Sequence, residues 1–302
     1  MEGRRARHRF ATKRAASLGD AALFVGPFLC LLLMFQYVPL AVMARDSLFN
    51  FSLLNPADST YAGLQNYTDL VGDPDGLQAF GVTLLLAVCA VALVIPSALL
   101  IALFLDAPLL GRSLVRTVIF LPVVTSVAVV ATMWTFLLDP TNGLIDAGVK
   151  LLGGSPFAFL TDKLQALPAI IVMTVWQQVG FAAVLFLSGL QNIPRELIDA
   201  AKIDGAGPFQ RLRLITVPLL GRTTMFIVVV MTVFSLQSFA PALIMTAGGP
   251  EGSTNFIIYH IYKTAFTLQA PGYASAVSVV LLALILLVSL VQMRLLRTGW
   301  TY

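Results

Sequence analysis

The sequence predicts an all-α, polytopic membrane protein with six transmembrane helices. Hydrophobic residues make up 58% of the 302 residues and charged residues only 11%, whereas soluble domains are about half apolar and about a quarter charged. The mean hydropathy is +0.88. The apolar residues also gather into runs that can cross a bilayer, which takes roughly 20 residues as a helix.

Six such runs occur along the chain. Backbone amides in lipid must be satisfied internally, so each run is either a helix or part of a closed barrel. A barrel would show alternating segments of about ten residues, and these runs are long and continuous. The expected helices are residues 21–44, 78–105, 116–138, 167–190, 223–246 and 273–293. They form one membrane domain, 21–295, between a basic tail, 1–20, and a short tail, 296–302.

Basic residues are distributed unequally between the two sides of the membrane. If the N-terminus is cytoplasmic, fifteen Lys and Arg residues fall on that side and four on the other. The four are Arg45, Lys150, Lys163 and Lys263. Because cytoplasmic segments are enriched in Lys and Arg, both termini and residues 191–222 are expected in the cytoplasm. We interpret the basic tail as an anchor facing anionic lipid rather than a nucleic-acid arm, so no nucleic-acid partner is expected.

The first span could be mistaken for a cleaved signal peptide. A basic tail precedes an apolar run that ends in Val42-Met43-Ala44, a pattern similar to a cleavage site. The run covers 24 residues, however, and a secretory apolar region has roughly 7–15. We therefore expect a transmembrane helix; cleavage would leave five spans.

The chain shows no pattern typical of catalysis or metal binding. Cys30 and Cys89 lie inside apolar runs, where cysteine behaves as a small hydrophobe. His8 and His260 are isolated from each other, far short of a metal-ligand set. Since the chain also lacks a phosphate-binding glycine loop, we expect neither an enzyme nor a metal site.

Several hydrogen-bonding side chains interrupt the spans. Unpaired in lipid they would be costly, so they should face other helices or a water-filled path. Two interpretations of these side chains remain open. They can form hydrogen bonds between helices, each worth about 0.6 kcal/mol on average, or they can line a path for a polar solute. For Gln177, Gln178 and Gln237 taken together, the solute path is the favoured interpretation. The candidate path residues are Thr125, Ser126, Trp176, Gln177, Gln178, Gln237 and Ser238.

Segment 191–222 is a polar interruption between the fourth and fifth spans. Pro194 suits the first turn of a helix, and residues 195–203 continue without a breaker. Asp204-Gly205 predicts a turn because glycine tolerates positive φ, and a second helix can begin at Pro208. The segment is therefore expected to be a hairpin of two short helices. It could rest on the lipid surface or provide a docking site for a soluble partner.

Residues of this segment resemble the EAA loop of binding-protein-dependent ABC importer permeases. The resemblance rests on Asp199-Ala-Ala-Lys-Ile-Asp-Gly-Ala206 followed by Ile215-Thr-Val-Pro218. Further matches to the carbohydrate-type branch run in order from about residue 20 to 295. They include Gly63-Leu-Gln-Asn-Tyr67, Arg116-Thr-Val-Ile-Phe-Leu-Pro122, Trp134, Thr246-Ala-Gly-Gly-Pro250 and Gly272-Tyr-Ala-Ser-Ala276.

The resemblance implies a type I ABC importer permease fold in a bacterial cytoplasmic (inner) membrane. It implies a second permease subunit, two copies of a cytoplasmic ATPase that hold ATP and Mg, and an extracytoplasmic solute-binding protein or lipoprotein. This chain would hold no cofactor. Asp199 stands where the family usually has Glu and would meet a basic residue of the ATPase. The coupling residues implied are Glu196, Asp199, Ala200, Ala201, Asp204, Gly205, Ala206 and Pro218.

Two segments are similar to the first permease of glycerol-3-phosphate or glycerophosphodiester importers, namely Ile203-Asp-Gly-Ala-Gly-Pro208 and Ile258-Tyr-His-Ile-Tyr-Lys263. A disaccharide or oligosaccharide importer is the alternative. No cluster of Arg or Lys lies within the spans, so a phosphate would be recognised largely by the binding protein. From other classes, a secondary transporter would need intramembrane carboxylates, which the span interiors lack. A scaffold remains an alternative if the hairpin docks something other than an ATPase.

Overall fold

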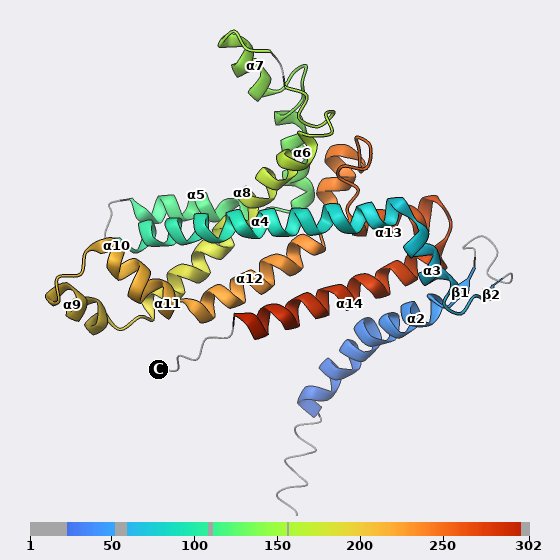
Figure 1. Ribbon diagram of the computed structural model, residues 1–302, viewed down its shortest axis with the longest axis horizontal. Coiled ribbons are helices and arrows are strands. Elements are labelled where there is room, and N and C mark those ends of the chain that lie inside the picture. Colours follow the sequence, from blue (N-terminus) through green and yellow to red (C-terminus); the bar gives the residue numbers. More distant parts are fainter. Residues whose placement is uncertain (1–22, 52–58, 108–110, 156, 297–302) are drawn as a thin grey trace, which may run out of the picture.

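A computed structural model describes residues 23–296 apart from 52–58, 108–110 and 156. The basic tail expected at 1–20 and residues 297–302 lie outside the described residues. The described chain is predominantly helical (Figure 1). Its elements are the π-helix η1 (Leu33–Tyr37), α2 (Val38–Asp46), β1 (Phe49–Asn50), β2 (Thr60–Tyr61), α3 (Gln65–Gly72), α4 (Pro74–Asp106), α5 (Arg112–Val124), α6 (Val127–Leu137), α7 (Leu144–Leu151), α8 (Ala166–Gln191), α9 (Arg195–Ile203), α10 (Pro208–Arg211), the π-helix η3 (Leu212–Thr216), α11 (Val217–Leu219), α12 (Gly221–Leu236), the π-helix η4 (Ala242–Thr246), α13 (Ile257–Tyr262), the π-helix η5 (Lys263–Thr267) and α14 (Pro271–Leu295).

The described residues provide the six expected spans. Four helices are each long and apolar enough to cross a membrane, and two bent helix pairs bring the number to six when each pair is counted as one span. The four helices are Leu23–Asp46, Pro74–Asp106, Ala166–Gln191 and Pro271–Leu295. The all-α, six-span fold is thus confirmed.

Two spans are broken where the sequence predicts continuous helices. The third, expected over 116–138, bends by 101° between α5 and α6, at Thr125 and Ser126. The fifth, expected over 223–246, is interrupted after Leu236 and becomes helical again in the π-helix η4, and its first part, α12, meets the helix before it at 67°. Hydropathy counts apolar residues and carries no information about such breaks. Pro122 does give a local signal, since it cannot donate a hydrogen bond in the last turn of α5.

The core lies between α4 and α8, which pack along much of their length. Fully buried alanines of α4, among them Ala90 and Ala98, allow this close approach, as small residues do between membrane helices. α12 packs beside α4 and buries Met231 against the same cluster. α14 lies next to α12, and the helix Leu23–Asp46 packs mainly against α14, with none of its most apolar window buried.

Two ends of the bundle are easily distinguished in Figure 1. The hairpin end, on the left, carries α9 and α10 together with the last turns of α4, α8 and α14. The opposite end carries β1, β2, α3 and α13. There, residues far apart in sequence are tied together: Ile257 donates its amide to Thr83 Oγ1 at 2.8 Å, and Tyr273 donates its hydroxyl to Asp73 Oδ2 at 2.7 Å.

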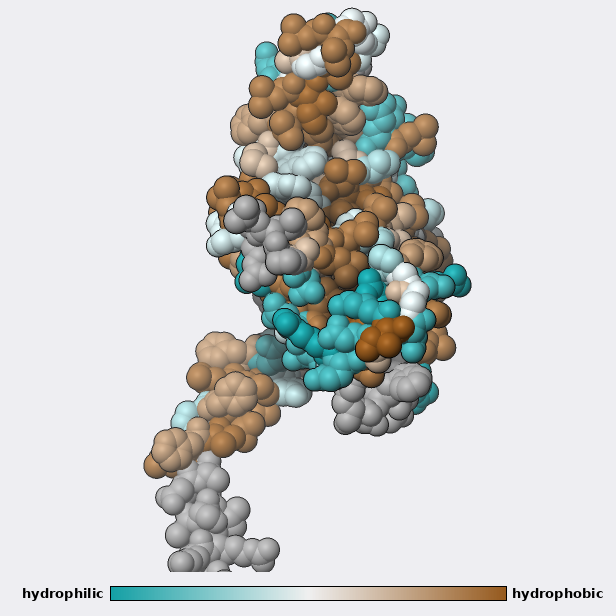
Figure 2. All heavy atoms as spheres, turned by 90° about the vertical axis from the view of Figure 1, so that its left-hand side faces the viewer, coloured by the Kyte–Doolittle hydropathy of each residue, from teal (hydrophilic) through white to brown (hydrophobic). Residues whose placement is uncertain are grey.

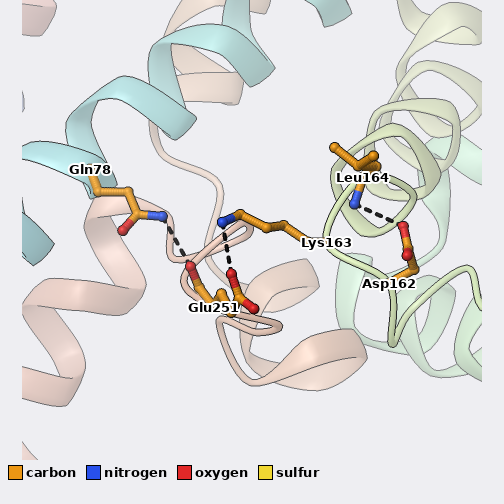
Figure 3. A network of polar contacts seen from close by, with 5 residues as sticks. All are labelled: Gln78, Asp162, Lys163, Leu164 and Glu251. Atoms are coloured by element: carbon orange, nitrogen blue, oxygen red, sulfur yellow. Dashed lines mark hydrogen bonds and ion pairs between the residues drawn. The ribbon is translucent and has the colours of Figure 1, made fainter.

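A loop before α13 is also held to its neighbours, as Figure 3 shows. Lys163 Nζ lies 2.7 Å from Glu251 Oε2, and Gln78 Nε2 donates to the Glu251 carbonyl at 3.1 Å. Asp162 Oδ1 accepts the amide of Leu164 at the turn that leads into α8. The start of α4, the turn before α8 and the loop before α13 are therefore joined at one place.

Candidate functional site

The polar segment 191–222 folds as the expected helical hairpin. α9 covers the predicted residues 195–203, and α10 continues through η3 to Thr216. Gly205 makes the reversal with φ +80°, a conformation that glycine adopts without strain. The amide of Ala206 bonds to the Ala201 carbonyl at 2.9 Å and so ends α9.

Most of the predicted coupling residues are on the surface of this hairpin. Glu196, Asp199, Ala200, Asp204, Gly205 and Pro218 are exposed, whereas Ala206 is half-buried and Ala201 is buried. Figure 2 looks onto the hairpin end, where hydrophilic side chains gather with hydrophobic ones exposed among them. The hairpin is therefore an accessible, mixed surface rather than part of the apolar bundle.

Asp199 is paired within the chain. Its Oδ1 lies 2.7 Å from Lys202 Nζ. The hydrogen bond and charge of Lys202 lower the pKa of Asp199 below its ordinary value, and the charges of Arg195 and Arg211 lower it further. The carboxylate is thus ionised and has Lys202 as its ion-pair partner.

A cleft separates the hairpin from the bundle. It has a volume of about 950 Å³ and is lined by the ends of α4 and α8 and by the inner face of the hairpin, with Asp106, Gln191, Arg195, Arg211 and Thr216 among its polar residues. The hairpin joins the bundle through α8 on one side and α12 on the other.

A second hollow lies within the bundle, between the broken spans and α8. This groove has a volume of about 580 Å³ and brings together Gln177, Gln178, Gln237 and Ser238. They are separated by as many as 61 positions in the sequence. Of the described residues that line the groove, none is charged.

The groove sits where the two broken spans expose their backbone. Gln177, only 8% exposed, directs its Nε2 to the Thr125 carbonyl at 3.4 Å, at the α5–α6 break. Gln237 and Ser238 directly follow the end of α12. Such irregular backbone at membrane depth is tolerated where it is buried in protein or lines a polar cavity.

Two polar atoms of groove residues have no hydrogen-bond partner among the described residues, Gln178 Oε1 and Thr174 Oγ1. Both atoms are buried, and an unpaired buried polar group is costly. The lining of the groove as a whole has amide and hydroxyl side chains beside the rings of Phe181, Phe234 and Phe239.

Three of the predicted path residues have other surroundings. Thr125 contributes its backbone carbonyl rather than its side chain, and Ser126 is exposed outside the groove lining. The ring of Trp176 packs against that of Trp134, with centroids 5.9 Å apart. Sequence reasoning missed Thr174 and Phe181, although their spacing of three or four positions from Gln177 and Gln178 places them on one helix face.

Comparison with known proteins places the chain in a family. A family model described as the binding-protein-dependent transport system inner membrane component matches residues 95–298. The chain belongs to this family. It is accordingly a membrane-spanning permease subunit of an ABC importer.

The relatives cover most of the chain. It is 37% identical over 282 residues to a probable ABC transporter permease protein, YurN, of Bacillus subtilis, covering 92% of this chain and 96% of that protein. It is 33% identical over 237 residues to the sn-glycerol-3-phosphate transport system permease protein UgpA of Yersinia pseudotuberculosis, covering 78% and 80%. A chain in the crystal structure of a bacterial ABC transporter involved in alginate import superposes with a TM-score of 0.83 at 22% identity, covering 98% of this chain and 100% of that chain. The permease fold expected from the resemblance is confirmed.

Proposed function

We propose that this permease forms half of the transmembrane path of an ATP-driven importer and that its hairpin docks on an ATPase subunit. The exposed helical hairpin at one end of a bundle that encloses an uncharged groove carries the proposal. One end of the molecule thus has an exposed surface to which a soluble partner can bind, and the interior has a polar lining for a solute.

The hairpin end is assigned to the cytoplasm. Arg116, Arg195, Arg211, Arg222 and Arg294 belong to the elements that meet there. The opposite end has Arg45, Lys163 and Lys263. Under the rule that short cytoplasmic loops are enriched in Lys and Arg, this distribution supports cytoplasmic termini in a bacterial inner membrane.

The energy source is proposed to be ATP bound with Mg²⁺ in the partner, and this chain acts without catalysing a reaction. An ion-coupled transporter needs titratable groups along its path, and the described groove lining has no carboxylate. The proposed assembly contains a second permease subunit, two ATPase copies, and an extracytoplasmic solute-binding protein or lipoprotein.

The mechanism follows from the geometry of the hairpin. When the ATPase pair closes, each docked hairpin moves as a rigid body, and the displacement passes through α8 and α12 to the groove between them. Such rigid-body motion exchanges access between the two sides of the membrane. The solute moves without chemical change.

The proposed solute is glycerol-3-phosphate, a glycerophosphodiester or a related compound, by analogy with the UgpA relatives. A sugar is the second candidate, and the uncharged groove favours it: amides and aromatic rings suit hydroxyl groups and sugar faces, whereas a phosphate would find no cation among the described lining residues. For a phosphorylated solute, the binding protein would have to select the phosphate.

The test is solute-stimulated ATP hydrolysis by the complete complex in lipid nanodiscs with its binding protein. Glycerol-3-phosphate, glycerophosphocholine, maltose and a longer oligosaccharide are compared. We expect one of the first two to raise the hydrolysis rate most. The largest stimulation by a sugar would transfer the assignment to the second candidate, and no stimulation by any solute would count against an importer of this class.

A further inference from the structure

The cleft between the hairpin and the bundle lies where two membrane spans end. Asp106 is the last residue of α4 and Gln191 the last of α8, and both line the cleft. Aliphatic side chains from these spans and from the hairpin line it as well, namely Leu103, Leu190, Ile193, Ile198 and Leu212. The cleft therefore joins apolar surface to polar groups at the level where the hydrocarbon of a membrane gives way to lipid headgroups.

The charges in this cleft do not cancel. Three basic and two acidic residues line it. Asp199 is paired with Lys202, which leaves Arg195, Arg211 and Asp106 without an ion pair among the described residues. Arg195 begins α9 and Arg211 ends α10, so two helices each bring a guanidinium group to the same space. The net charge of +1 suits a ligand with one negative charge.

Arg211 is the clearest sign of a missing partner. It is half-buried, and a charge withdrawn from water is costly unless it is paired. Phosphate is the anion whose geometry a guanidinium group matches best, through two parallel hydrogen bonds. The volume of about 950 Å³ also falls in the range of about 300–1,000 Å³ that holds whole small molecules, so a phosphate group leaves most of the cleft for an apolar remainder.

We infer that this cleft binds an anionic phospholipid of the surrounding membrane. Arg195 and Arg211 bind its phosphate, and the aliphatic side chains of α4 and α8 contact the beginning of its acyl chains. Basic pockets at the cytoplasmic ends of membrane helices suit such headgroups. The inference goes beyond the proposed function and is independent of which solute is carried. A lipid bound here contacts both the hairpin and the bundle and so stabilises their arrangement.

Native mass spectrometry of the complete complex in detergent tests the site. The complex is titrated with phosphatidylglycerol, which has one net negative charge, or with zwitterionic phosphatidylcholine. Arg195→Gln and Arg211→Gln are compared with the unaltered chain. Arg213→Gln is the matched control, because Arg213 is exposed, lies two positions from Arg211 and is absent from the cleft lining. All three substitutions remove one positive charge from the hairpin, so a non-specific attraction would weaken equally in each.

We expect each cleft variant to retain one phosphatidylglycerol molecule fewer than the unaltered complex at limiting lipid, because the loss of a charge-assisted hydrogen bond raises Kd about tenfold. Arg213→Gln should retain the full number, and phosphatidylcholine should bind the unaltered complex more weakly. Equal losses in all three variants, or no loss in either cleft variant, would overturn the inference. Thermal midpoints without added lipid show which variants fold, and if one cleft variant does not, the other decides.

Inorganic phosphate and glycerol-3-phosphate distinguish a lipid from a free phosphate compound. Neither has acyl chains to contact the aliphatic side chains, so a large excess of either should leave phosphatidylglycerol bound. Displacement of the lipid by either compound from the unaltered complex, but not from the cleft variants, would assign the two arginines to a soluble ligand and overturn the lipid site.

Discussion

The close approach of α5 and α8 provides a sensitive test of the fold around the groove. A Cβ added to Gly180 would overlap the carbonyl oxygen of Ile119 and lie 3.0 Å from Val123 Cγ2. Backbone atoms cannot move aside as a flexible side chain can, so Gly180→Ala must push α5 away from α8. Overpacking of this kind costs about 1–3 kcal/mol, of which the helix propensity of alanine offsets about 1 kcal/mol, so the remaining cost of up to about 2 kcal/mol corresponds to a fall of up to roughly 8 °C in Tm.

The matched control is Gly81→Ala. Gly81 lies within α4, and a Cβ there meets nothing within 4 Å. Alanine favours a helix interior over glycine by about 1 kcal/mol, and this gain applies to both variants. Differential scanning fluorimetry of the purified complex should therefore show Gly81→Ala unchanged or more stable and Gly180→Ala less stable.

The same variant should impair transport. Gln177 lies one turn before Gly180 on the same helix face and contacts the Thr125 carbonyl of α5 at 3.4 Å. Moving α5 away opens this contact and reshapes the groove, so solute-stimulated ATP hydrolysis should fall several-fold in Gly180→Ala and not in Gly81→Ala. Equal stability and equal activity of the two variants would refute the close packing of α5 on α8.

Three further predictions concern the hairpin, the groove and the opposite end. Gly205→Ala places a side chain at φ +80°, which costs about 1–2 kcal/mol. This variant should reduce the coupling of ATP hydrolysis to uptake, whereas Gly205→Asn should retain most of the coupling. Equal coupling in both variants would argue against a rigid turn. Gln177→Leu and Gln237→Leu should lower uptake at limiting solute while the amount of assembled complex, measured by size-exclusion chromatography, stays the same; unchanged uptake would make both glutamines packing residues. Burial lowers the pKa of His260 below its ordinary 6.5, although the charge of Asp73 acts in the other direction. As the pH falls below about 6.5, the unfolded chain takes up a proton at this histidine before the folded chain does, so the stability of the folded chain should decline. Tm measured from pH 7.5 to 5 should show this decline in the unaltered chain and not in His260→Gln. An identical pH profile of Tm in both would contradict a lowered pKa of His260.

Much of the fold can be predicted from hydropathy and turn chemistry. The starts and ends of α8 and α14 fall within two residues of the expected spans, because long continuous apolar runs must be helical in lipid. The hairpin helix 195–203 was predicted to the residue, since Pro194 and Gly205 are strong local signals at its two ends.

The site could be predicted less completely because it depends on contacts between distant segments. The sequence marks Gln177 and Gln237 as polar, but only the breaks after Val124 and Leu236 bring them to one groove. Those breaks depend on how the helices pack, and the hydropathy of a sequence carries no information about packing. The pairing of Asp199 with Lys202, in contrast, has a local signal: three positions apart on a helix, opposite charges are neighbours. The resemblance directed attention to a partner residue instead.

The most direct test of the account is solute uptake by proteoliposomes that contain the complete complex and its binding protein. ATP is sealed inside with Mg²⁺, and matched vesicles receive either a non-hydrolysable analogue or an imposed proton or sodium gradient. We expect uptake only in vesicles that hydrolyse ATP. Uptake driven by an ion gradient without ATP would contradict the claim that this hairpin couples the path to an ATPase.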